Sequence, residues 1–260
     1  MPKGKADFQG NADSERPAMT VRALVFDAYG TLYDVQSVRG LAVGLCGPKG
    51  ELVTQLWRLK QLEYSWLRGL MGGDEDFWRL TRASLEFALE AAGVAADPKL
   101  CERLMAKYLD LDLYPEAREA LDVLAGRKLA ILSNGSQKML DALVEASGVG
   151  PLFADVISVA RANTFKPDPK CYALVEPALG VGKHEVLFVS SNGFDVAGAK
   201  AFGFKVAWIE RGGGVTPASS DIGPAELYKL LRGRAEKLGP GADFRIKALT
   251  DLPSVAARLG

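Results

Sequence analysis

The second half of the sequence alternates helical and strand-forming segments, and this alternation limits the possible folds more than any other feature. From Pro115 onward, amphipathic stretches precede short apolar runs, and the pattern repeats until about residue 210. The expected helix and strand pairs are 116–125 with 129–132, 137–146 with 156–159, 169–179 with 186–189, and 196–202 with 206–209. Strands separated by helices in this way form parallel sheets with helices on both faces. The sequence therefore predicts an α/β fold.

One further apolar run, Ala23–Phe26, stands near the N-terminus and is followed directly by Asp27. Continuous apolar runs are typical of strands covered on both faces, so this segment is expected to be a buried strand of the same sheet. Ligands of open α/β sheets bind beyond the carboxyl ends of the strands, which is where Asp27 would lie. Taken alone, however, an aspartate at this position is more often a turn-initiating residue.

The residues between this strand and the alternating half have a helical pattern. Leucines at three- and four-residue steps mark one amphipathic helix over 52–70, Asp74 or Asp76 can cap a second, and a third begins at Asp97. The polar, aperiodic N-terminus is expected to be disordered, and helices are expected in the tail near 225–237 and 252–259. The predicted parts are a disordered extension (1–19), an α/β core domain (20–34 and 112–260) and an inserted helical cap domain (35–111).

Composition excludes several classes of partner and chemistry. Thirty-two basic residues balance thirty-two acidic ones, so a nucleic-acid partner is not expected. No apolar run approaches the roughly 18 residues that a membrane helix needs, and a secretory pattern is absent, so we expect no membrane partner and a cytoplasmic location. The single histidine, His184, and three widely spaced cysteines argue against histidine-based catalysis, disulfides and thiolate metal sites.

Polar residues also follow the later strands of the predicted sheet. Ser133 and Asn134 lie between a strand and a helix, where they can receive an anion or simply cap the helix. Lys166 precedes a proline, which favours an extended backbone and would hold the ammonium toward neighbouring loops; a solvated loop lysine is the alternative. Asn192 and Asp195 follow the next strand and can also act as a capping pair. Their common position after strands is the pattern expected if these loops converge on one site.

These residues, in this order, resemble the motifs of the haloacid dehalogenase superfamily. The matching stretches are Asp27-Ala28-Tyr29-Gly30-Thr31, Ser133-Asn134-Gly135, Lys166-Pro167-Asp168 and Ser190-Ser191-Asn192-Gly193-Phe194-Asp195. Within the superfamily, segments 56–64, 66–68, 131–136 and 188–192 are similar to the L-2-haloacid dehalogenases. The resemblance covers roughly residues 21–210 and implies a Rossmann-like sheet core with a helical cap inserted after its first strand.

The residues themselves favour this group over the phosphatases on the same scaffold. Such phosphatases carry a second aspartate two residues after the nucleophile, where this chain has Tyr29, and an acidic pair where it has Ser190 and Ser191. A departing halide needs no proton, whereas a departing alkoxide usually does. With fewer carboxylates and Lys166 nearby, the site also has less need of a metal, so neither a metal nor a cofactor is expected.

The resemblance implies hydrolytic dehalogenation of short-chain L-2-haloalkanoic acids to D-2-hydroxy acids. Asp27 would displace the halide and form an aspartyl ester, which water would hydrolyse with Asp195 as the activating base. Lys166 would keep Asp27 ionised, because a nearby cation favours the charged form. The catalytic residues implied are Asp27, Thr31, Arg58, Ser133, Asn134, Lys166, Tyr172, Ser190, Asn192 and Asp195.

The resemblance also implies how the substrate is held. Arg58 and Asn134 would receive the halide, while Ser133 and two backbone N–H groups would hold the substrate carboxylate. The substrate-binding residues implied are Ala28, Tyr29, Arg58, Leu59, Leu62, Phe77, Ser133, Asn134 and Phe194. Without the resemblance, Arg58 would be interpreted as a solvated charge of a cap helix and the apolar residues as ordinary core.

The expected partners are a 2-haloacid, the halide ion and a second copy of the chain, because the apolar cap and the tail after Gly212 suggest a homodimer. Two other functions stay open from the sequence. The first is a magnesium-dependent phosphatase, which would need another general acid in place of Tyr29. The second is a non-catalytic binding protein, against which the presence of Asp27, Arg58, Lys166 and Asp195 argues.

Overall fold

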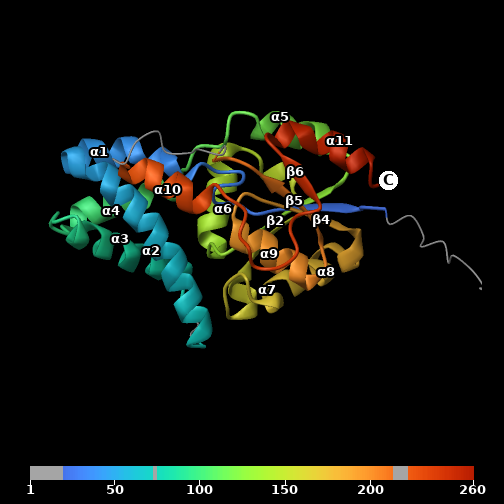
Figure 1. Ribbon diagram of the computed structural model, residues 1–260, viewed down its shortest axis with the longest axis horizontal. Helices are drawn as coiled ribbons and strands as arrows, with labels where there is room; N and C mark the ends of the chain where they lie inside the picture. The colour runs from blue at the N-terminus through green and yellow to red at the C-terminus, as the bar shows by residue number, and fades with distance from the viewer. Residues whose placement is uncertain (1–19, 73–74, 213–221) are drawn as a thin grey trace, which may run out of the picture.

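The computed structural model describes residues 20–72, 75–212 and 222–260, so the extension predicted over residues 1–19 lies outside the described residues. Among these residues, six strands form one parallel sheet in the order β3-β2-β1-β4-β5-β6 (Figure 1). The strands are β1 (Ala23–Phe26), β2 (Lys128–Ser133), β3 (Asp155–Ser158), β4 (Val186–Ser190), β5 (Lys205–Ile209) and β6 (Phe244–Ile246). The predicted α/β fold with a parallel sheet is confirmed.

Helices fill the chain between β1 and β2, as the sequence predicted. They are α1 (Arg39–Cys46), α2 (Gly50–Leu70), α3 (Phe77–Ala91) and α4 (Pro98–Lys107), followed by α5 (Ala117–Leu124). Asp76 caps α3 by accepting a hydrogen bond from the backbone N–H of Trp78, and Asp97 caps α4 similarly; Asp74 lies outside the described residues. Figure 1 shows α1–α4 gathered at one end of the sheet, with α2 packed along α3.

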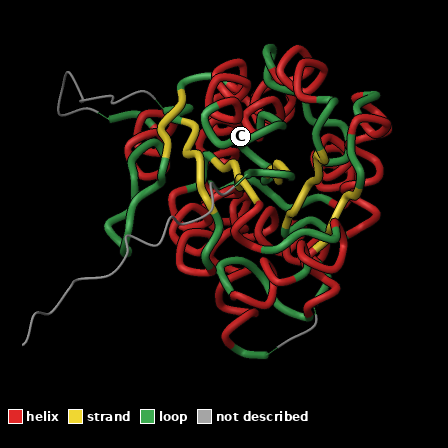
Figure 2. Tube along the Cα trace, turned by 90° about the vertical axis from the view of Figure 1, so that its right-hand side faces the viewer, coloured by secondary structure: helices red, strands yellow, loops and turns green. Residues whose placement is uncertain are grey.

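The remaining helices cover the two faces of the sheet. Helices α5 and α11 (Leu252–Ala257) contact each other on one face, whereas α7 (Pro169–Ala173), α8 (Val175–Leu179) and α9 (Gly193–Phe202) lie on the other (Figure 1). Helix α6 (Gln137–Ser147) connects β2 to β3. The side view in Figure 2 shows the strands enclosed between helices. None of the described helices is both long and apolar enough to cross a lipid bilayer.

One predicted helix is interrupted. Residues 169–179 were expected to form a single helix, but the structure has two short ones, α7 and α8, that meet at Leu174. Pro177 explains the break, because proline has no backbone N–H and therefore cannot bond to the carbonyl one turn earlier. The apolar pattern of residues 169–179 therefore predicted one continuous helix where the backbone forms two short ones.

The tail contains one strand that the sequence did not predict. Helix α10 (Pro224–Arg232) begins near its expected start but ends at Arg232, five residues before the expected end at 237. Strand β6 then pairs parallel to β5, with Arg245 opposite Trp208. Strand β6 has only three residues, and the central one is charged, so its sequence contains no apolar run from which a strand could be predicted. The strand is recognised only by its pairing with β5. The last helix, α11, lies where it was expected.

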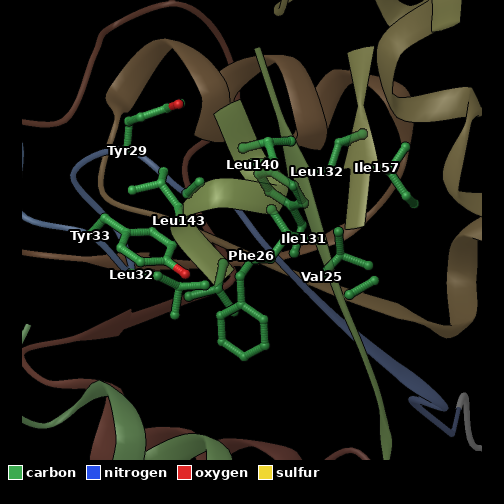
Figure 3. Packing of buried hydrophobic residues seen from close by; sticks show 14 of the residues in the cluster. Val25, Phe26, Tyr29, Leu32, Tyr33, Ile131, Leu132, Leu140, Leu143 and Ile157 are labelled. Atoms are coloured by element: carbon green, nitrogen blue, oxygen red, sulfur yellow. The ribbon is translucent and has the colours of Figure 1, made fainter. Parts of the chain in front are cut away.

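The hydrophobic core surrounds β1. The side chains of β1 are at most 1% exposed, and those of Phe26 and Ile131 lie among residues of α6 such as Leu140 and Leu143 (Figure 3). Burying one such side chain contributes about 1.5–3 kcal/mol, so the core holds this strand rigidly. Asp27 follows β1 immediately, so its backbone is positioned by the best-packed part of the protein.

Candidate active site

The carboxyl ends of three neighbouring strands bring the predicted polar residues together. Strand β1 pairs in register with β2 on one side and β4 on the other, so all three end at the same edge of the sheet. Asp27 follows β1, while Ser133 and Ser190 are the last residues of β2 and β4. Side chains as far apart in sequence as Asp27 and Asn192, separated by 165 positions, are thereby in hydrogen-bonding contact.

Lys166 is buried among three acceptors at this edge. Its Nζ lies 3.2 Å from Asp27 Oδ1, 2.9 Å from Asp195 Oδ2 and 2.6 Å from the carbonyl oxygen of Leu132. The side chain is only 2% exposed, which excludes the alternative of a solvated loop lysine. A buried ammonium is tolerated when its N–H groups are paired, and here all three have an acceptor.

The carboxylates around Lys166 determine its charge. Burial alone lowers the pKa of the Lys166 ammonium, but the Asp195 and Asp27 carboxylates outweigh this and raise the pKa above its ordinary value. Burial raises the pKa of the Asp195 carboxyl to about 6, against the opposing effect of Lys166. The Lys166 ammonium is therefore charged at neutral pH. Tyr172 holds Asp195 in place by donating its hydroxyl to Oδ1 at 2.8 Å.

The other oxygen of Asp27 accepts two hydrogen bonds. Thr31 Oγ1 donates to Asp27 Oδ2 at 3.0 Å, and Asn192 Nδ2 donates to the same oxygen at 2.9 Å. The backbone N–H of Ser191 donates to Thr31 Oγ1 at 2.9 Å, so the hydroxyl proton of Thr31 is directed at Asp27. Ser190 Oγ accepts from the backbone N–H of Asn192 at 3.1 Å and so supports the loop without touching Asp27. Ser191 was not among the predicted site residues.

Arg58 reaches into the site from helix α2 of the inserted segment. Its Nη1 donates to Gln61 Oε1 at 2.6 Å and its Nη2 to the carbonyl oxygen of Tyr29 at 3.3 Å. The residue is 3% exposed, so it is not a solvated helix charge. Its Nε has no hydrogen-bond partner within the described residues. A buried guanidinium with donors to spare is suited to receive an anion.

Between these groups lies a small pocket of about 10 Å³. The residues that line it are Asp27, Tyr29, Arg58, Leu62, Phe77, Ser133, Asn134, Lys166, Asn192 and Phe194, all of them predicted from the sequence. Leu59, predicted for the apolar wall, is half-buried and is not among these lining residues. Leu59 directly follows Arg58 and therefore lies on a different face of α2, whereas Leu62, four residues after Arg58, lies on the same face as Arg58.

The other predicted catalytic residues lie behind this lining. Thr31, Tyr172, Ser190 and Asp195 are each fully buried and contact the pocket only through the residues that line it. They fix the positions of Asp27, Lys166 and Asn192. The structure therefore divides the predicted catalytic residues into those that line the pocket and those that lie directly behind the lining.

Several hydrogen-bond donors beside the pocket are unused. Neither the backbone N–H of Ala28 nor that of Tyr29 donates within the described residues. Asn134 Oδ1 accepts from the backbone N–H of Lys166 at 2.9 Å, which leaves the two N–H donors of its amide available. Ser133 Oγ accepts from Gly135 at 3.3 Å. Backbone and amide N–H groups at a strand end form a site for a carboxylate or a halide.

Two glycines that were not among the predicted site residues allow this packing. A Cβ at Gly135 would meet the hydroxyl of Tyr29 at 2.9 Å, and one at Gly198 would overlap the Tyr172 hydroxyl and Pro167. Tyr29 is fully buried beside Gly135, and burial raises the pKa of its phenol well above the ordinary value. Its hydroxyl has no partner within the described residues. Tyr29 thus forms an apolar wall where a phosphatase would place an acid.

The acidic residues of the site do not form a metal-ligand cluster. Across residues 20–72, 75–212 and 222–260, no group of three or more His, Cys, Asp or Glu side chains could hold a metal ion. Asp27 and Asp195 are bridged by the Lys166 ammonium. Charge neutralisation in this cluster therefore comes from lysine.

Comparison with known proteins places this arrangement in a family. The family model of haloacid dehalogenase-like hydrolases matches residues 21–203. An (S)-2-haloacid dehalogenase of Xanthobacter autotrophicus is 49% identical over 237 residues, covering 90% of this chain and 94% of that one. The (S)-2-haloacid dehalogenase 1 of Pseudomonas sp. (strain CBS-3) is 44% identical over 241 residues, covering 92% and 98%.

A solved structure is similar over nearly the whole chain. It is that of the L-2-haloacid dehalogenase from Xanthobacter autotrophicus with chloropropionic acid covalently bound. Its TM-score is 0.87 at 46% sequence identity, covering 92% of this chain and 99% of that one. Because the family model spans most of the sequence and the similar enzymes match over almost their full length, this chain belongs to the haloacid dehalogenase-like hydrolases, in the group of the (S)-2-haloacid dehalogenases.

Proposed function

We propose that this protein hydrolyses short-chain L-2-haloalkanoic acids to D-2-hydroxy acids through a covalent ester of Asp27. The observation that carries this proposal is the set of contacts around Asp27. One carboxylate oxygen of Asp27 accepts a hydrogen bond from Lys166, and the other accepts from Thr31 and Asn192. Arg58 lines the same pocket. The site combines a positioned carboxylate nucleophile with donors for two anions. Hydrolytic carbon–halogen cleavage needs both.

In the first step, a carboxylate oxygen of Asp27 bonds to the halogen-bearing carbon. The carbon–halogen bond breaks, and the halogen leaves with the bonding electrons as halide. Oδ1 is the better candidate for attack, because it accepts only from Lys166 whereas Oδ2 accepts from both Thr31 and Asn192. Attack opposite to the leaving group inverts the carbon centre, which converts an L substrate into a D product.

In the second step, water attacks the ester carbonyl of Asp27. If Oδ1 has formed the ester, Oδ2 is the carbonyl oxygen, and Thr31 and Asn192 already donate to it at 3.0 and 2.9 Å. These two donors would stabilise the negative charge that develops on Oδ2, as in an oxyanion hole. The bond from the carbonyl carbon to Oδ1 then breaks, the departing alkoxide takes up a proton that came from the water and leaves as the hydroxy acid with Oδ1, and Asp27 keeps an oxygen of the water.

We assign the base of this second step to Asp195. Once Asp27 is esterified it is neutral, and Asp195 is the remaining carboxylate in contact with Lys166. Its two oxygens accept one side-chain hydrogen bond each, from Lys166 and Tyr172, whereas a carboxylate can accept about four. Asp195 therefore has capacity to take a proton from water. The Xanthobacter enzyme with chloropropionic acid covalently bound supports a covalent route in this family.

The pocket suggests how the two anions are separated. Arg58 and Asn134 would receive the departing halide, each with N–H donors left over. Ser133 and the backbone N–H groups of Ala28 and Tyr29 would hold the substrate carboxylate. Leu62, Phe77 and Phe194 would exclude water, together with the ring of Tyr29. The inserted residues 35–111 would act as a cap, because they supply Arg58, Leu62 and Phe77 to a site built on the core.

The enantiomers of 2-chloropropionate provide the direct test of this function. We expect halide release from the L enantiomer and D-lactate as the product, with the same rate in the presence of EDTA, because the site bridges its carboxylates with Lys166. Halide and lactate are measured for each enantiomer with and without the chelator. Magnesium-dependent hydrolysis of p-nitrophenyl phosphate without halide release would instead favour the phosphatase.

We also propose that the protein is a cytoplasmic homodimer. Leu70 and Met71, at the C-terminal end of α2, are 86% and 65% exposed, and Figure 1 shows this end of α2 extending beyond the neighbouring helices. Exposed apolar side chains that gather on one surface often mark an interface. We expect light scattering to give the mass of two chains over a wide concentration range, and Leu70→Lys combined with Met71→Lys to lower that mass. A single-chain mass for the unmodified protein would contradict the proposal.

A further inference from the structure

A second and much larger cavity lies beside the catalytic pocket. Its volume is about 460 Å³, and it is bordered by the loop after β1, the start of the inserted segment, β5 and helix α10. Asn192 lines both this cavity and the catalytic pocket. Since the amide of Asn192 also donates to Asp27 Oδ2 at 2.9 Å, this side chain contacts both the cavity and the proposed nucleophile. Cavities of about this size are typical of small-molecule sites.

The charged residues of this cavity are mostly basic. Arg39, Arg211, Lys229 and Arg232 line it, against the single carboxylate of Asp34. Arg39 and Arg211 already have acidic partners elsewhere, at 3.1 Å and 2.6 Å. The other two cations are less well compensated, and both belong to helix α10.

Helix α10 presents these two cations to the cavity from one face. Ala225, Tyr228, Lys229 and Arg232 all line it, at the spacing of one helix face. Lys229 forms no ion pair within the described residues, and Arg232 has only Glu236, at 3.5 Å. The Nε of Arg232 is buried and has no partner among the described residues. The cavity therefore contains positive charge that is available to a ligand.

Helix α10 is held between the two parts that form the active site. It packs against α2, which carries Arg58, and the Arg232 guanidinium lies 5.9 Å from the ring of Trp66 in α2. Just beyond the helix, Glu236 packs against Gly193 at the start of α9. Burial lowers the pKa of Arg232, and the nearby charge of Arg58 contributes to this. Arg232 in the cavity is therefore close enough to Arg58 in the catalytic pocket for the two positive charges to interact.

Another cavity beside the catalytic pocket lacks this positive lining. It has a volume of about 160 Å³ and shares Phe77 and Asn134 with the pocket. Its charged lining residues are Asp76 and Glu75, which pairs with Arg68 at 3.0 Å, and no basic side chain lines it in the described part of the chain. A carboxylate substrate is therefore less favoured there than on the side of α10.

We propose that the 460 Å³ cavity is an anion-binding vestibule, in which Lys229 and Arg232 bind the carboxylate of a 2-haloalkanoate before it passes Asn192 to reach Asp27. The pocket around Asp27 encloses only about 10 Å³, whereas the adjoining cavity has room for a short haloalkanoate. The tryptophan and tyrosine rings of Trp208 and Tyr114 in the vestibule offer a surface for a short alkyl chain. This inference rests on the function proposed above.

The test is a charge removal on α10. Lys229→Gln combined with Arg232→Gln is expected to lower kcat/KM for L-2-chloropropionate about tenfold at low ionic strength, the lower end of the usual steering effect. The expected change in kcat is less than about twofold, because neither residue touches Asp27. Lys237→Gln, an exposed cation of the same tail outside the cavity, is the matched control and should behave like the unmodified enzyme.

Salt and charge reversal separate electrostatic capture from a structural effect. Raising the ionic strength with sodium sulfate from about 0.01 M to 1 M shortens the Debye length from about 30 Å to 3 Å. At the higher ionic strength, the difference in kcat/KM between the unmodified enzyme and the double variant should therefore largely disappear. Arg232→Lys, which keeps the charge, should retain most of kcat/KM. Equal losses in kcat and kcat/KM, or a salt-independent loss, would overturn the vestibule.

Two further outcomes identify what binds. If inhibition by added chloride weakens in the double variant while kcat/KM is unchanged, the cavity serves the departing halide, and the proposal for the substrate is wrong. If the unmodified enzyme releases no halide from either enantiomer, the proposed function itself fails. An active enzyme whose kcat/KM is insensitive to both substitutions contradicts the vestibule alone.

Discussion

Replacing Asp27 by asparagine is expected to abolish dehalogenation, with a loss of turnover on the order of 10⁴- to 10⁶-fold, as is usual when a covalent nucleophile is removed. An amide oxygen is a poor nucleophile, yet asparagine has nearly the shape of aspartate. Lys166 would keep its contacts with Asp195 and the Leu132 carbonyl, so the fold should survive. Halide release measures turnover, and circular dichroism with thermal unfolding checks the fold.

The control for this variant is chemical. Asparagine can deamidate to aspartate, so the mass of the peptide that contains residue 27 has to be verified before kinetics. Near-full activity in a preparation without detectable aspartate would contradict a covalent role for Asp27.

Isotope labelling distinguishes a nucleophilic Asp27 from one that only activates water. With enzyme in excess and a single turnover in oxygen-18 water, covalent catalysis gives an unlabelled hydroxy acid, because its new oxygen is the former Oδ1 of Asp27. The heavy oxygen then appears in the peptide containing Asp27. Both routes invert the carbon centre, so product configuration cannot replace this measurement. Label in the product alone would make Asp27 a general base.

Replacing Arg58 by alanine is expected to give the second largest effect, a loss of about 10²- to 10³-fold in kcat, typical of removing one donor to a developing anion. The variant leaves the side-chain oxygen Oε1 of Gln61 and the backbone carbonyl of Tyr29 without the donors they now have. Arg58→Lys should recover only part of the activity, since an ammonium cannot reproduce the planar array of guanidinium donors. Steady-state halide release gives kcat and KM for each variant.

A neighbouring arginine provides the matched control. Arg82, on α3 of the same helical segment, pairs with Glu86 and is 34% exposed, so Arg82→Ala removes the same side chain away from the pocket. It should leave kcat unchanged. If Arg58→Ala and Arg58→Lys both behave like the unmodified enzyme, Arg58 has no part in halide departure and the cap assignment fails.

The sequence by itself determined strands β1–β5 of the sheet and the polar residues that follow them. The apolar run before Asp27, the runs before Ser133 and Ser190, and the caps at Asp76 and Asp97 are local patterns, in which each residue type specifies the conformation of its own segment. The carboxyl ends of parallel strands lie at one edge of such a sheet, so these local patterns, together with the resemblance to the superfamily motifs, led us to expect Asp27, Ser133, Lys166 and Asn192 to converge.

Only the tertiary structure decided which side chains touch. Gln61 beside Arg58 and Ser191 beside Thr31 depend on contacts between distant segments, as do Gly198 beneath Tyr172 and the exclusion of Leu59 from the pocket. Strand β6 is defined by its pairing with β5, because a three-residue segment has too little pattern of its own. The basic cavity under α10 likewise arises where the tail, the inserted helices and the sheet meet. Such contacts depend on how rigid elements pack in three dimensions, which no periodicity along one segment records.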